Sequence, residues 1–477
     1  MSDHKSVMLE ALQRQRDAFN RELPVSAEVR KDRIRRVMQL IQENAAELAA
    51  AINEDFSYRS TTWTYMSDFA GTLNHLELAI SHCEEWMQPE RRAANEPGCQ
   101  VGAIAEIQYQ PKGIVGVVAP WNYPVHLACQ PLGDIFAAGN RAMIKPSEYT
   151  PKTSALMKVL FEKYFSPEEA IVFDGGPEVG VAFCSLPLDH LLFTGAPSIA
   201  PHIMRAAAEN LVPVTLELGG KSPTILGNGA DLQLAVTRII AGKLMNAGQT
   251  CLAPDYLCVP RDQVAEVVEI IKQVTDRLYP DMLGGNDDYT AIINLRHHAR
   301  LTGYLAQAIE QGTEVVEVNP GNHSGERSDR MIPLNLLMDP SDNLDVMKDE
   351  IFGPLLPIKP YDSIDEVIHY VQYQPRPLAL YYFGNDEAEI QALLDRTISG
   401  GVCINDVIMH CSEHDMPFGG VGASGMGAYH GIFGFREFSH AKSVLTQSTQ
   451  DILAMLRTPY SAEVKGYLKM KVETQQA

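Results

Sequence analysis

The spacing of hydrophobic residues in the first part of the chain predicts amphipathic helices. Residues 4–56 carry an apolar stripe at helical spacing, and Ser26 stands where it can cap a helix N-terminus. Residues 60–88 repeat this spacing with apolar side chains at Tyr65, Phe69, Leu73, Leu76 and Ile80. Residues 89–97 break the pattern, and residues 101–109 are expected to form a strand outside the main core.

From residue 114 onward, short apolar runs alternate with helical segments. The predicted strands are 114–119, 142–145, 170–173, 190–194 and 214–218. Strands that alternate with helices at this spacing indicate a parallel sheet with helices on both faces. The pattern is that of a dinucleotide-binding fold, although the first strand is not followed by GxGxxG.

A second alternating block occupies residues 223–400, and a glycine-rich segment follows from 401 to 445. A single glycine-rich loop is weak evidence for phosphate binding. We therefore expect these glycines to serve packing and turns.

Composition excludes several classes of partner. The chain has 477 residues, is 45% hydrophobic, and carries a net charge of −21 from 39 basic and 60 acidic residues. Nucleic acids and anionic membranes require basic patches, so neither is expected as a partner. The N-terminus lacks an apolar signal segment and residues 465–477 are polar, which predicts a soluble cytoplasmic protein.

The eight cysteines form no CxxC pair and no ligand-like spacing, so no metal site is expected. Reduced thiols of a cytoplasmic protein are the simplest interpretation. Cys258 lies in an apolar strand-like run and is predicted to be a core residue. Cys403 and Cys411 are also expected to be structural.

Cys251 differs from these cysteines because it ends the small polar run Asn246-Ala247-Gly248-Gln249-Thr250. A thiol at such a turn can lie close to backbone N–H groups, which favour the thiolate, the form that attacks a carbonyl. Cys251 is therefore a candidate nucleophile. The alternative is a buried structural cysteine.

Two further stretches supply matching chemistry. Glu217 ends an apolar strand before Leu218-Gly219-Gly220-Lys221, where burial would raise its pKa toward that of a general base. Asn122, in Pro120-Trp121-Asn122-Tyr123-Pro124, follows another strand and can direct an amide N–H toward a developing oxyanion. The alternatives are a solvated carboxylate and an ordinary turn residue.

Together these stretches resemble the aldehyde dehydrogenase superfamily, and the 34 positions from Glu217 to Cys251 resemble its class 3 branch. The resemblance covers residues 10–445. It implies an α/β fold with a Rossmann-like cofactor domain (1–98 and 113–219), a second α/β catalytic domain (220–402), a small β oligomerisation flap (99–112 and 403–446) and a C-terminal tail (447–477).

The resemblance also implies oxidation of an aldehyde to an acid with NAD, NADP being possible. Cys251 would form a thiohemiacetal and then a thioester, Asn122 would bind the oxyanion, and Glu217 would activate the hydrolytic water. One alternative is an acylating enzyme that passes the thioester to coenzyme A, which would need no base at Glu217. The other is an inactive structural or binding protein on the same fold.

The cofactor contacts implied by the resemblance fall into two groups. Lys145, Ser147 and Glu148 match the motif in which lysine and glutamate hold the adenosine ribose. Glu350 and Phe352 match the motif that positions the nicotinamide ribose. The remaining residues expected to border the cofactor are Trp121 and Gly195.

One segment departs from the family pattern. Ala196 replaces a serine and Ala200 replaces a glycine in the turn that should lead to the cofactor pyrophosphate. Pro197 and Pro201 are four residues apart and cannot both occupy the first position of one regular helix. We therefore predict that the helix begins near Pro201, after a distorted turn at 197–200.

The class 3 resemblance finally implies an aromatic or medium-chain apolar aldehyde as substrate. Tyr123 and Met245 flank the catalytic stretches and are candidates to line an apolar entry. A homodimer is the assembly that the family implies.

Overall fold

The computed structural model describes residues 2–96, 98–413, 415–451 and 453–473. Contacts divide the chain into two units. The larger unit comprises the chain up to residue 86 together with 111–438, and the smaller comprises 87–110 together with the chain from 439 onward. The larger unit holds two sheets with helices packed on them, so the predicted α/β class is confirmed.

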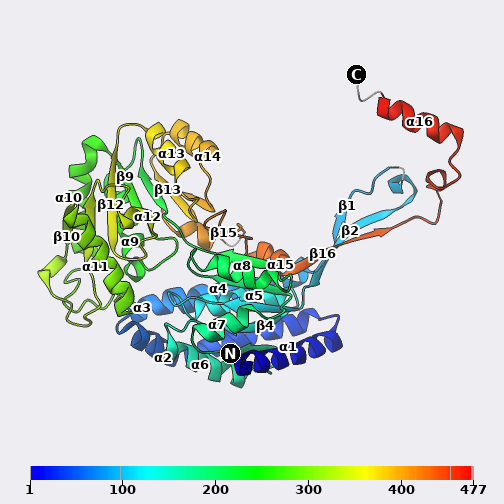
Figure 1. Cartoon of the computed structure of the whole chain (residues 1–477), viewed down its shortest axis with the longest axis horizontal. Helices are drawn as coiled ribbons and strands as arrows, with labels where there is room; N and C mark the ends of the chain where they lie inside the picture. Colours follow the sequence, from blue (N-terminus) through cyan, green and yellow to red (C-terminus); the bar gives the residue numbers. More distant parts are fainter. Residues whose placement is uncertain (1, 97, 414, 452, 474–477) are drawn as a thin grey trace. The chain divides into compact units, whose positions relative to one another are not determined.

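The first sheet, which includes β4 and β15 in Figure 1, has six strands in the order β15-β7-β6-β3-β4-β5. Its parallel strands are β3 (Ile114–Val118), β4 (Arg141–Lys145), β5 (Ala170–Val172), β6 (His190–Thr194) and β7 (Val214–Glu217). The edge strand β15 (Gly425–Met426) runs antiparallel to β7. The strand bounds predicted from the sequence are confirmed to within one residue.

Helices connect these strands in chain order: α5 (His126–Ala137), α6 (Pro151–Tyr164), α7 (Pro177–Cys184) and α8 (Ala200–Ala208). Because parallel crossovers are right-handed and the strand order reverses after β5, α5 and α6 lie on one face of the sheet and α7 and α8 on the other. Apolar residues of α7 and α8 accordingly share one buried cluster with Ile114, Leu191 and Leu216 of the strands.

The N-terminal helices add a second layer. They are α1 (Ser2–Glu22), α2 (Ala27–Phe56), α3 (Thr61–Thr64), the π-helical turn η1 (Tyr65–Ala70) and α4 (Gly71–Trp86). The predicted cap is confirmed, since the Ser26 hydroxyl accepts a hydrogen bond from the Val29 amide at 3.3 Å. The single helix predicted over 60–88 is interrupted by the π-helical turn, which the hydrophobic spacing did not indicate.

The second sheet has seven strands in the order β10-β11-β12-β9-β8-β13-β14. They are β8 (Pro223–Leu226), β9 (Tyr256–Pro260), β10 (Glu314–Val318), β11 (Leu334–Met338), β12 (Leu355–Tyr361), β13 (Ala379–Phe383) and β14 (Gly401–Ile404). The accompanying helices are α9 (Leu232–Leu244), α10 (Val264–Leu278), α11 (Leu295–Glu310), α12 (Asp345–Lys348), α13 (Ile364–Tyr373) and α14 (Glu387–Arg396), whereas α15 (Gly431–Glu437) packs against α4 and α5. All pairs except β10–β11 are parallel.

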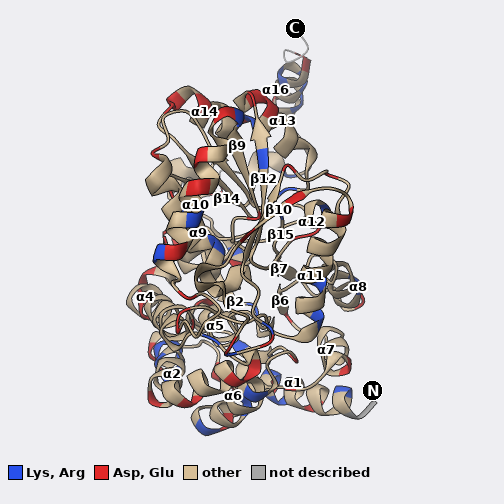
Figure 2. Cartoon of the chain, turned by 90° about the vertical axis from the view of Figure 1, so that its left-hand side faces the viewer, with Lys and Arg blue, Asp and Glu red and all other residues tan. Residues whose placement is uncertain are grey.

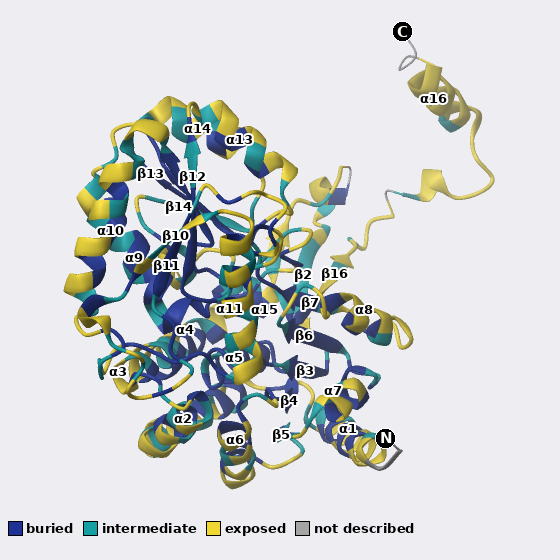
Figure 3. Ribbon diagram, turned by 60° about the vertical axis from the view of Figure 1, so that its left-hand side comes forward, coloured by how far each residue is buried: buried dark blue, intermediate teal, exposed yellow. Residues whose placement is uncertain are grey.

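Alternate residues of a strand face opposite sides of this sheet. Leu257 packs with α9, α10 and α11 on one face, whereas Tyr256 and Cys258 pack with α13 and α14 on the other. Cys258 is 3% exposed, as predicted for a core residue. Figure 3 shows the strands buried and the outer faces of the helices exposed, and Figure 2 shows charged residues on helices such as α10, α13 and α14.

The smaller unit contains a three-stranded sheet in the order β1-β2-β16. Its strands are β1 (Glu90–Arg92), β2 (Ile104–Pro111) and β16 (Ser439–Thr446), and its C-terminal helix is α16 (Ala462–Glu473). The predicted strand over 101–109 corresponds to β2, which is only partly buried. Residues 474–477 of the predicted tail lie outside the described residues.

Candidate active site

The predicted site residues of the first half of the chain gather at one edge of the first sheet. Asn122 follows β3, Lys145 ends β4, Gly195 follows β6, and Glu217 ends β7. Parallel strands present their carboxyl ends at the same edge, where open α/β sheets bind ligands. The arrangement of the strands thus brings these residues to a common site.

Cys251 is carried by a strained turn after α9. Asn246 and Ala247 both have φ of 52°, in the left-handed region that non-glycine residues rarely adopt, and Gly248 follows with φ of 74°. A Cβ atom on Gly248 would lie 2.3 Å from the Gly353 carbonyl oxygen, so this position requires glycine. Strained backbone of this kind persists only where its surroundings enforce it.

Gln249 enforces this conformation with three hydrogen bonds. Its Nε2 donates to the carbonyl oxygens of Asn246 at 3.0 Å and Ala291 at 3.1 Å, and its Oε1 accepts from the Ile293 amide at 2.9 Å. The side chain is fully buried. It fixes the turn whose next residues are Thr250 and Cys251.

The Cys251 thiol is partly buried and lies near two carboxylates. Burial raises its pKa well above the ordinary value, and the negative charges of Glu350 and Glu217 act in the same direction. The residue's own backbone N–H opposes this rise, as expected for a thiol at such a turn, but burial outweighs it. The thiol therefore needs a base before it can act as a nucleophile.

Glu217 is 3% exposed, and neither of its carboxylate oxygens has a hydrogen-bond partner among the described residues. Burial raises its pKa well above the ordinary value, and the charge of Glu437 raises it further. A buried carboxylate without partners is costly to ionise. Its affinity for a proton is therefore high, as a general base requires.

Glu437, which ends α15, reaches the same face of β7 through Thr215. The Thr215 hydroxyl donates to the Glu437 carboxylate and lies 2.7 Å from Nε2 of His190. Thr215 and Glu217 are two residues apart on one strand and share a face. Gly425 pairs with Glu217, so the glycine-rich segment packs beside the carboxylate, in line with the packing role predicted for its glycines.

Asn122 lies against the turn that carries Cys251. Its Nδ2 donates to the Gln249 carbonyl at 3.2 Å, and its own carbonyl accepts from Nδ2 of Asn246 at 3.2 Å. The hydroxyls of Tyr123 and Thr250 are 2.6 Å apart. The structure thus joins the Asn122 and Cys251 stretches directly. Met245 caps α9 and is partly buried against the core.

At the end of β4, Lys145 is 3% exposed, and its Nζ lies 3.5 Å from the Glu148 carboxylate. Nζ also donates to the Pro146 carbonyl at 2.7 Å. The Ser147 hydroxyl accepts from the Tyr149 amide at 3.2 Å and so stabilises the local turn. Lysine and glutamate side chains at the sheet edge suit the hydroxyls of a ribose.

Glu350 lies against the glycines that follow Glu217. A Cβ atom on Gly219 would lie 2.0 Å from its Oε1, and this oxygen is buried without a partner among the described residues. Burial raises the pKa of Glu350 to about 8. An unpaired buried acceptor fits a ribose hydroxyl of a nicotinamide cofactor, and the rings of Trp121 and Phe352, the other residues predicted to contact it, lie 5.3 Å apart.

The segment that carries Glu350 is held by a buried ion pair between Lys221 and Asp255. Nζ of Lys221 also donates to the carbonyls of Val346 at 2.8 Å and Asp349 at 3.0 Å. Asp255 accepts from the Ile351 amide at 2.9 Å. Lys221 stands in the stretch that follows Glu217, but nothing in its sequence spacing indicated this role.

The structure confirms the predicted start of the helix after β6. Regular helix α8 begins at Ala200 with Pro201 in its first turn, and residues 197–199 form a turn in which the Ile199 amide donates to Ala196. The Gly195 amide donates to the Glu217 carbonyl at 3.0 Å. A Cβ atom on Gly195 would lie 2.6 Å from the Phe193 ring, which explains the glycine.

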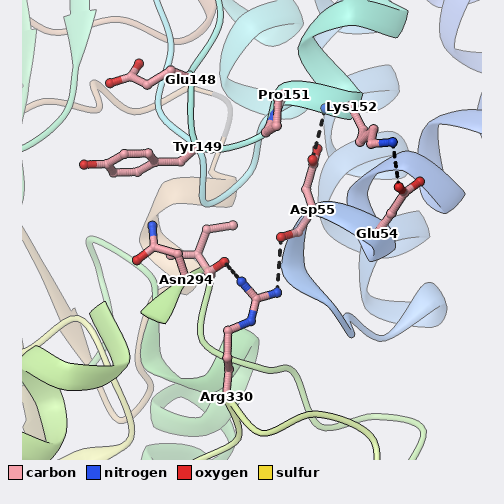
Figure 4. A pocket seen from close by; sticks show the side chains of 9 residues that line it. Glu54, Asp55, Glu148, Tyr149, Pro151, Lys152, Asn294 and Arg330 are labelled. Atoms are coloured by element: carbon pink, nitrogen blue, oxygen red, sulfur yellow. Dashed lines mark hydrogen bonds and ion pairs between the residues drawn. The ribbon is translucent and has the colours of Figure 1, made fainter. Parts of the chain in front are cut away.

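Glu148 also borders a polar pocket, together with Tyr149 and residues of α2, α6 and the loops at 293–294 and 330 (Figure 4). Arg330 donates to the carbonyls of Asp55 and Ile293 there, while the Asp55 carboxylate accepts from the first amides of α6. Cys251, Glu217 and Asn122 do not line this pocket.

Over the part of the chain that the structure describes, no three His, Cys, Asp or Glu side chains are grouped as metal ligands. None of the helices described combines the length and the apolar character that crossing a membrane demands.

Three residues that support the site were not predicted from the sequence: Arg59, Gln249 and Glu437. Their contacts join segments that are distant in the sequence. Only Gln249 could have been identified, because its amide side chain stands in the polar run before Cys251.

Comparisons with known proteins identify the family of the chain. A profile of the aldehyde dehydrogenase family matches residues 3–444. The probable coniferyl aldehyde dehydrogenase of Caulobacter vibrioides is 50% identical over 474 residues, which cover 98% of each chain. Aldehyde dehydrogenase family 3 member A2 of Rattus norvegicus is 36% identical, over 95% of this chain and 92% of the relative. The substrate-bound structure of Staphylococcus aureus AldH has a TM-score of 0.90 at 34% identity, covering 97% of this chain and 99% of that one.

Proposed function

The chain belongs to the aldehyde dehydrogenase family and is an enzyme of NAD(P)-dependent aldehyde oxidation, and from this premise we propose the role of each site residue. The resemblance to the class 3 branch is confirmed, and the chain is also similar to bacterial coniferyl aldehyde dehydrogenases. The observation that carries the proposal is Glu217. It is a buried carboxylate without a hydrogen-bond partner among the described residues, and it lies close enough to Cys251 for its charge to act on the thiol, whose pKa is raised chiefly by burial.

In the first half of the reaction, the thiol of Cys251 gives up its proton to solvent, and the resulting thiolate sulfur attacks the aldehyde carbon. The carbonyl oxygen becomes negative and is bound by Nδ2 of Asn122 and the backbone N–H of Cys251. One such donor contributes roughly 10²–10³ in rate. A nicotinamide cofactor held at this site would supply the hydride acceptor that the oxidation of the thiohemiacetal on Cys251 to a thioester requires.

In the second half, Glu217 removes a proton from water as the water oxygen attacks the thioester carbon. The carbon–sulfur bond then breaks, the acid leaves, and the proton returns to the sulfur of Cys251. Burial of Glu217 supports this role, because a base of raised pKa takes a proton from water more readily.

For cofactor binding, we propose that Lys145, Ser147 and Glu148 hold the adenosine ribose and that Glu350 and Phe352 hold the nicotinamide ribose. Trp121 and Gly195 would border the cofactor. We propose NAD as the preferred cofactor, because the Glu148 carboxylate repels a 2′-phosphate at the hydroxyl that it binds.

For the substrate, we propose an aromatic aldehyde such as coniferyl aldehyde, with a medium-chain apolar aldehyde as the second candidate. The relative named as a probable coniferyl aldehyde dehydrogenase supports the first. Tyr123 and Met245 would line an apolar entry. The comparisons do not favour the two alternatives, an acylating enzyme and an inactive protein, and an acylating enzyme would not need Glu217.

We further propose a cytoplasmic homodimer. In it, residues 1–98 and 113–219 would bind the cofactor, 220–402 would form the catalytic domain, and 99–112 with 403–446 would contribute to oligomerisation.

A substrate panel tests this proposal. Aromatic and aliphatic aldehydes would be offered with NAD or NADP, and reduced nicotinamide would be followed by absorbance. We expect the highest kcat/KM with coniferyl aldehyde and NAD, and no stimulation by coenzyme A. Product formation that depends on coenzyme A would contradict the proposed role of Glu217.

A further inference from the structure

A fully buried ion pair lies behind Asn122. Arg59, between α2 and α3, donates from Nη2 to the carboxylate of Asp68 in the π-helical turn η1 at 2.7 Å. Both side chains are 0% exposed. Burying two charges carries a large desolvation penalty, so such a pair is weak evidence of a role in stability alone.

The other contacts of Arg59 point to the oxyanion residue. Its Nη1 donates to the Asn122 carbonyl at 2.9 Å. The guanidinium lies over two rings, 5.1 Å from the centroid of Tyr123 and 4.9 Å from that of Phe56. Arg59 thus contacts both Asn122 and its neighbour Tyr123.

Asp68 holds the other end of the same loop. Its Oδ1 accepts from the amides of Val125 at 3.1 Å and His126 at 3.2 Å, where α5 begins. The first amides of a helix have no partner within the helix, and a carboxylate satisfies them favourably. The ion pair therefore spans the loop from Asn122 to the start of α5. A π-helical turn, a feature frequent at functional sites, carries Asp68.

Across the loop, the contacts continue to the nucleophile. The Asn122 carbonyl that accepts from Arg59 also accepts from Asn246, and the Asn122 amide donates to Gln249. The Tyr123 hydroxyl forms a hydrogen bond with the hydroxyl of Thr250, the residue before Cys251. Arg59 is therefore connected through Asn122 and Tyr123 to both sides of the turn that carries Cys251.

We propose that Arg59, held by Asp68, is a positioning residue that fixes the Asn122 carboxamide for oxyanion binding, an inference that rests on the role proposed above for Asn122. Arginine suits this position because its planar fork binds a carbonyl and a carboxylate at once while its faces stack on rings. Lysine keeps the charge but cannot make all these contacts. The lost contacts would free the loop and misplace the amide.

A double-mutant cycle tests this inference, with the rate constant of the first turnover of reduced nicotinamide measured by rapid mixing. Arg59→Lys should lower this rate constant by about 10- to 100-fold, the range of effects that small misplacements produce. In an Asn122→Ala background, the same substitution should cause no further loss, because the amide to be positioned is gone. A purely structural role would lower the amplitude and the melting temperature but not the rate constant.

Arg33→Lys is the matched control. Arg33 is also a buried arginine paired with carboxylates, but its partners are Glu22 and Glu169, outside the site. Its substitution should lower stability without changing the rate constant. If Arg59→Lys does not fold, Asp68→Asn gives the same comparison, because it keeps the shape of the side chain and removes the charge that holds Arg59.

Two outcomes overturn the inference: an unchanged rate constant in Arg59→Lys, or an equal loss in the wild-type and Asn122→Ala backgrounds. If Asn122→Ala lowers the rate constant of the first turnover and Arg59→Lys does not, the proposed function is supported and only the role of Arg59 is wrong. If the rate constant of Asn122→Ala equals that of the wild type, the role proposed for Asn122 is wrong.

Discussion

The side-chain nitrogen of Asn122 lies 3.2 Å from the carbonyl oxygen of Gln249, two residues before Cys251. A carboxamide nitrogen carries two hydrogens. One is used in this bond, so the other remains for an oxygen that becomes negative when Cys251 attacks. The same contact that fixes the turn thus orients the proposed oxyanion donor.

Asn122→Ala should slow the first turnover by about 10²–10³-fold, because one preorganised donor to the oxyanion is lost. The rate constant would be measured by rapid mixing, with the melting temperature as the control for folding. If this rate constant falls by less than about tenfold in well-folded protein, Asn122 does not bind the oxyanion.

Glu217→Gln should change how stability depends on pH. Burial raises the pKa of Glu217 in the folded state, so its contribution to stability is present at low pH and is lost as pH rises through that pKa. The variant cannot ionise at this position. Its melting temperature relative to wild type should therefore increase as the pH is raised, and a difference that shrinks with pH would refute the assigned shift.

Glu437→Gln should move the pH dependence of acid release. The charge of Glu437 raises the pKa of Glu217, which must be deprotonated to act as a base. Removing that charge lowers the pKa, so the acid limb of the rate profile should shift to lower pH. The exposed Glu310, on α11 and outside the site, provides the matched control through Glu310→Gln, which should leave the limb in place. An unmoved limb in Glu437→Gln would show that Glu437 does not influence the base.

The triple variant Ala196→Ser, Ala200→Gly and Pro201→Arg should bind NAD more tightly. It restores the serine hydroxyl and adds an amide donor at the start of α8, where a pyrophosphate would be held. Calorimetry would give the dissociation constant, and the rate of the chemical step should not change. If affinity is the same in the folded variant, this end of the helix does not bind the pyrophosphate.

Local features of the fold were predictable because local physics determines them. The alternation of apolar strands and helices located β3 to β7, and Ser26 marked the start of α2. The two prolines four residues apart placed the start of α8, since only one can occupy the first helical position.

The support of the site was not predictable in the same way. Arg59 and Asn122 are far apart in sequence, and no periodic pattern links an arginine to a distant carbonyl. The same holds for Glu437, which accepts a hydrogen bond from Thr215 on β7 and acts on Glu217 although it lies far away in the sequence. The left-handed turn at Asn246 and Ala247 also runs against local preference and is imposed by Gln249.

Trapping the thioester on Cys251 tests the proposed mechanism most directly. Glu217→Gln enzyme would be mixed with NAD and an aromatic aldehyde, and the intact chain and its peptides would be weighed by mass spectrometry. We expect one equivalent of NADH and one acyl group per chain, on the peptide that contains Cys251. A full equivalent of NADH with no acyl group on Cys251, or with the acyl group on another cysteine such as Cys411, would contradict it.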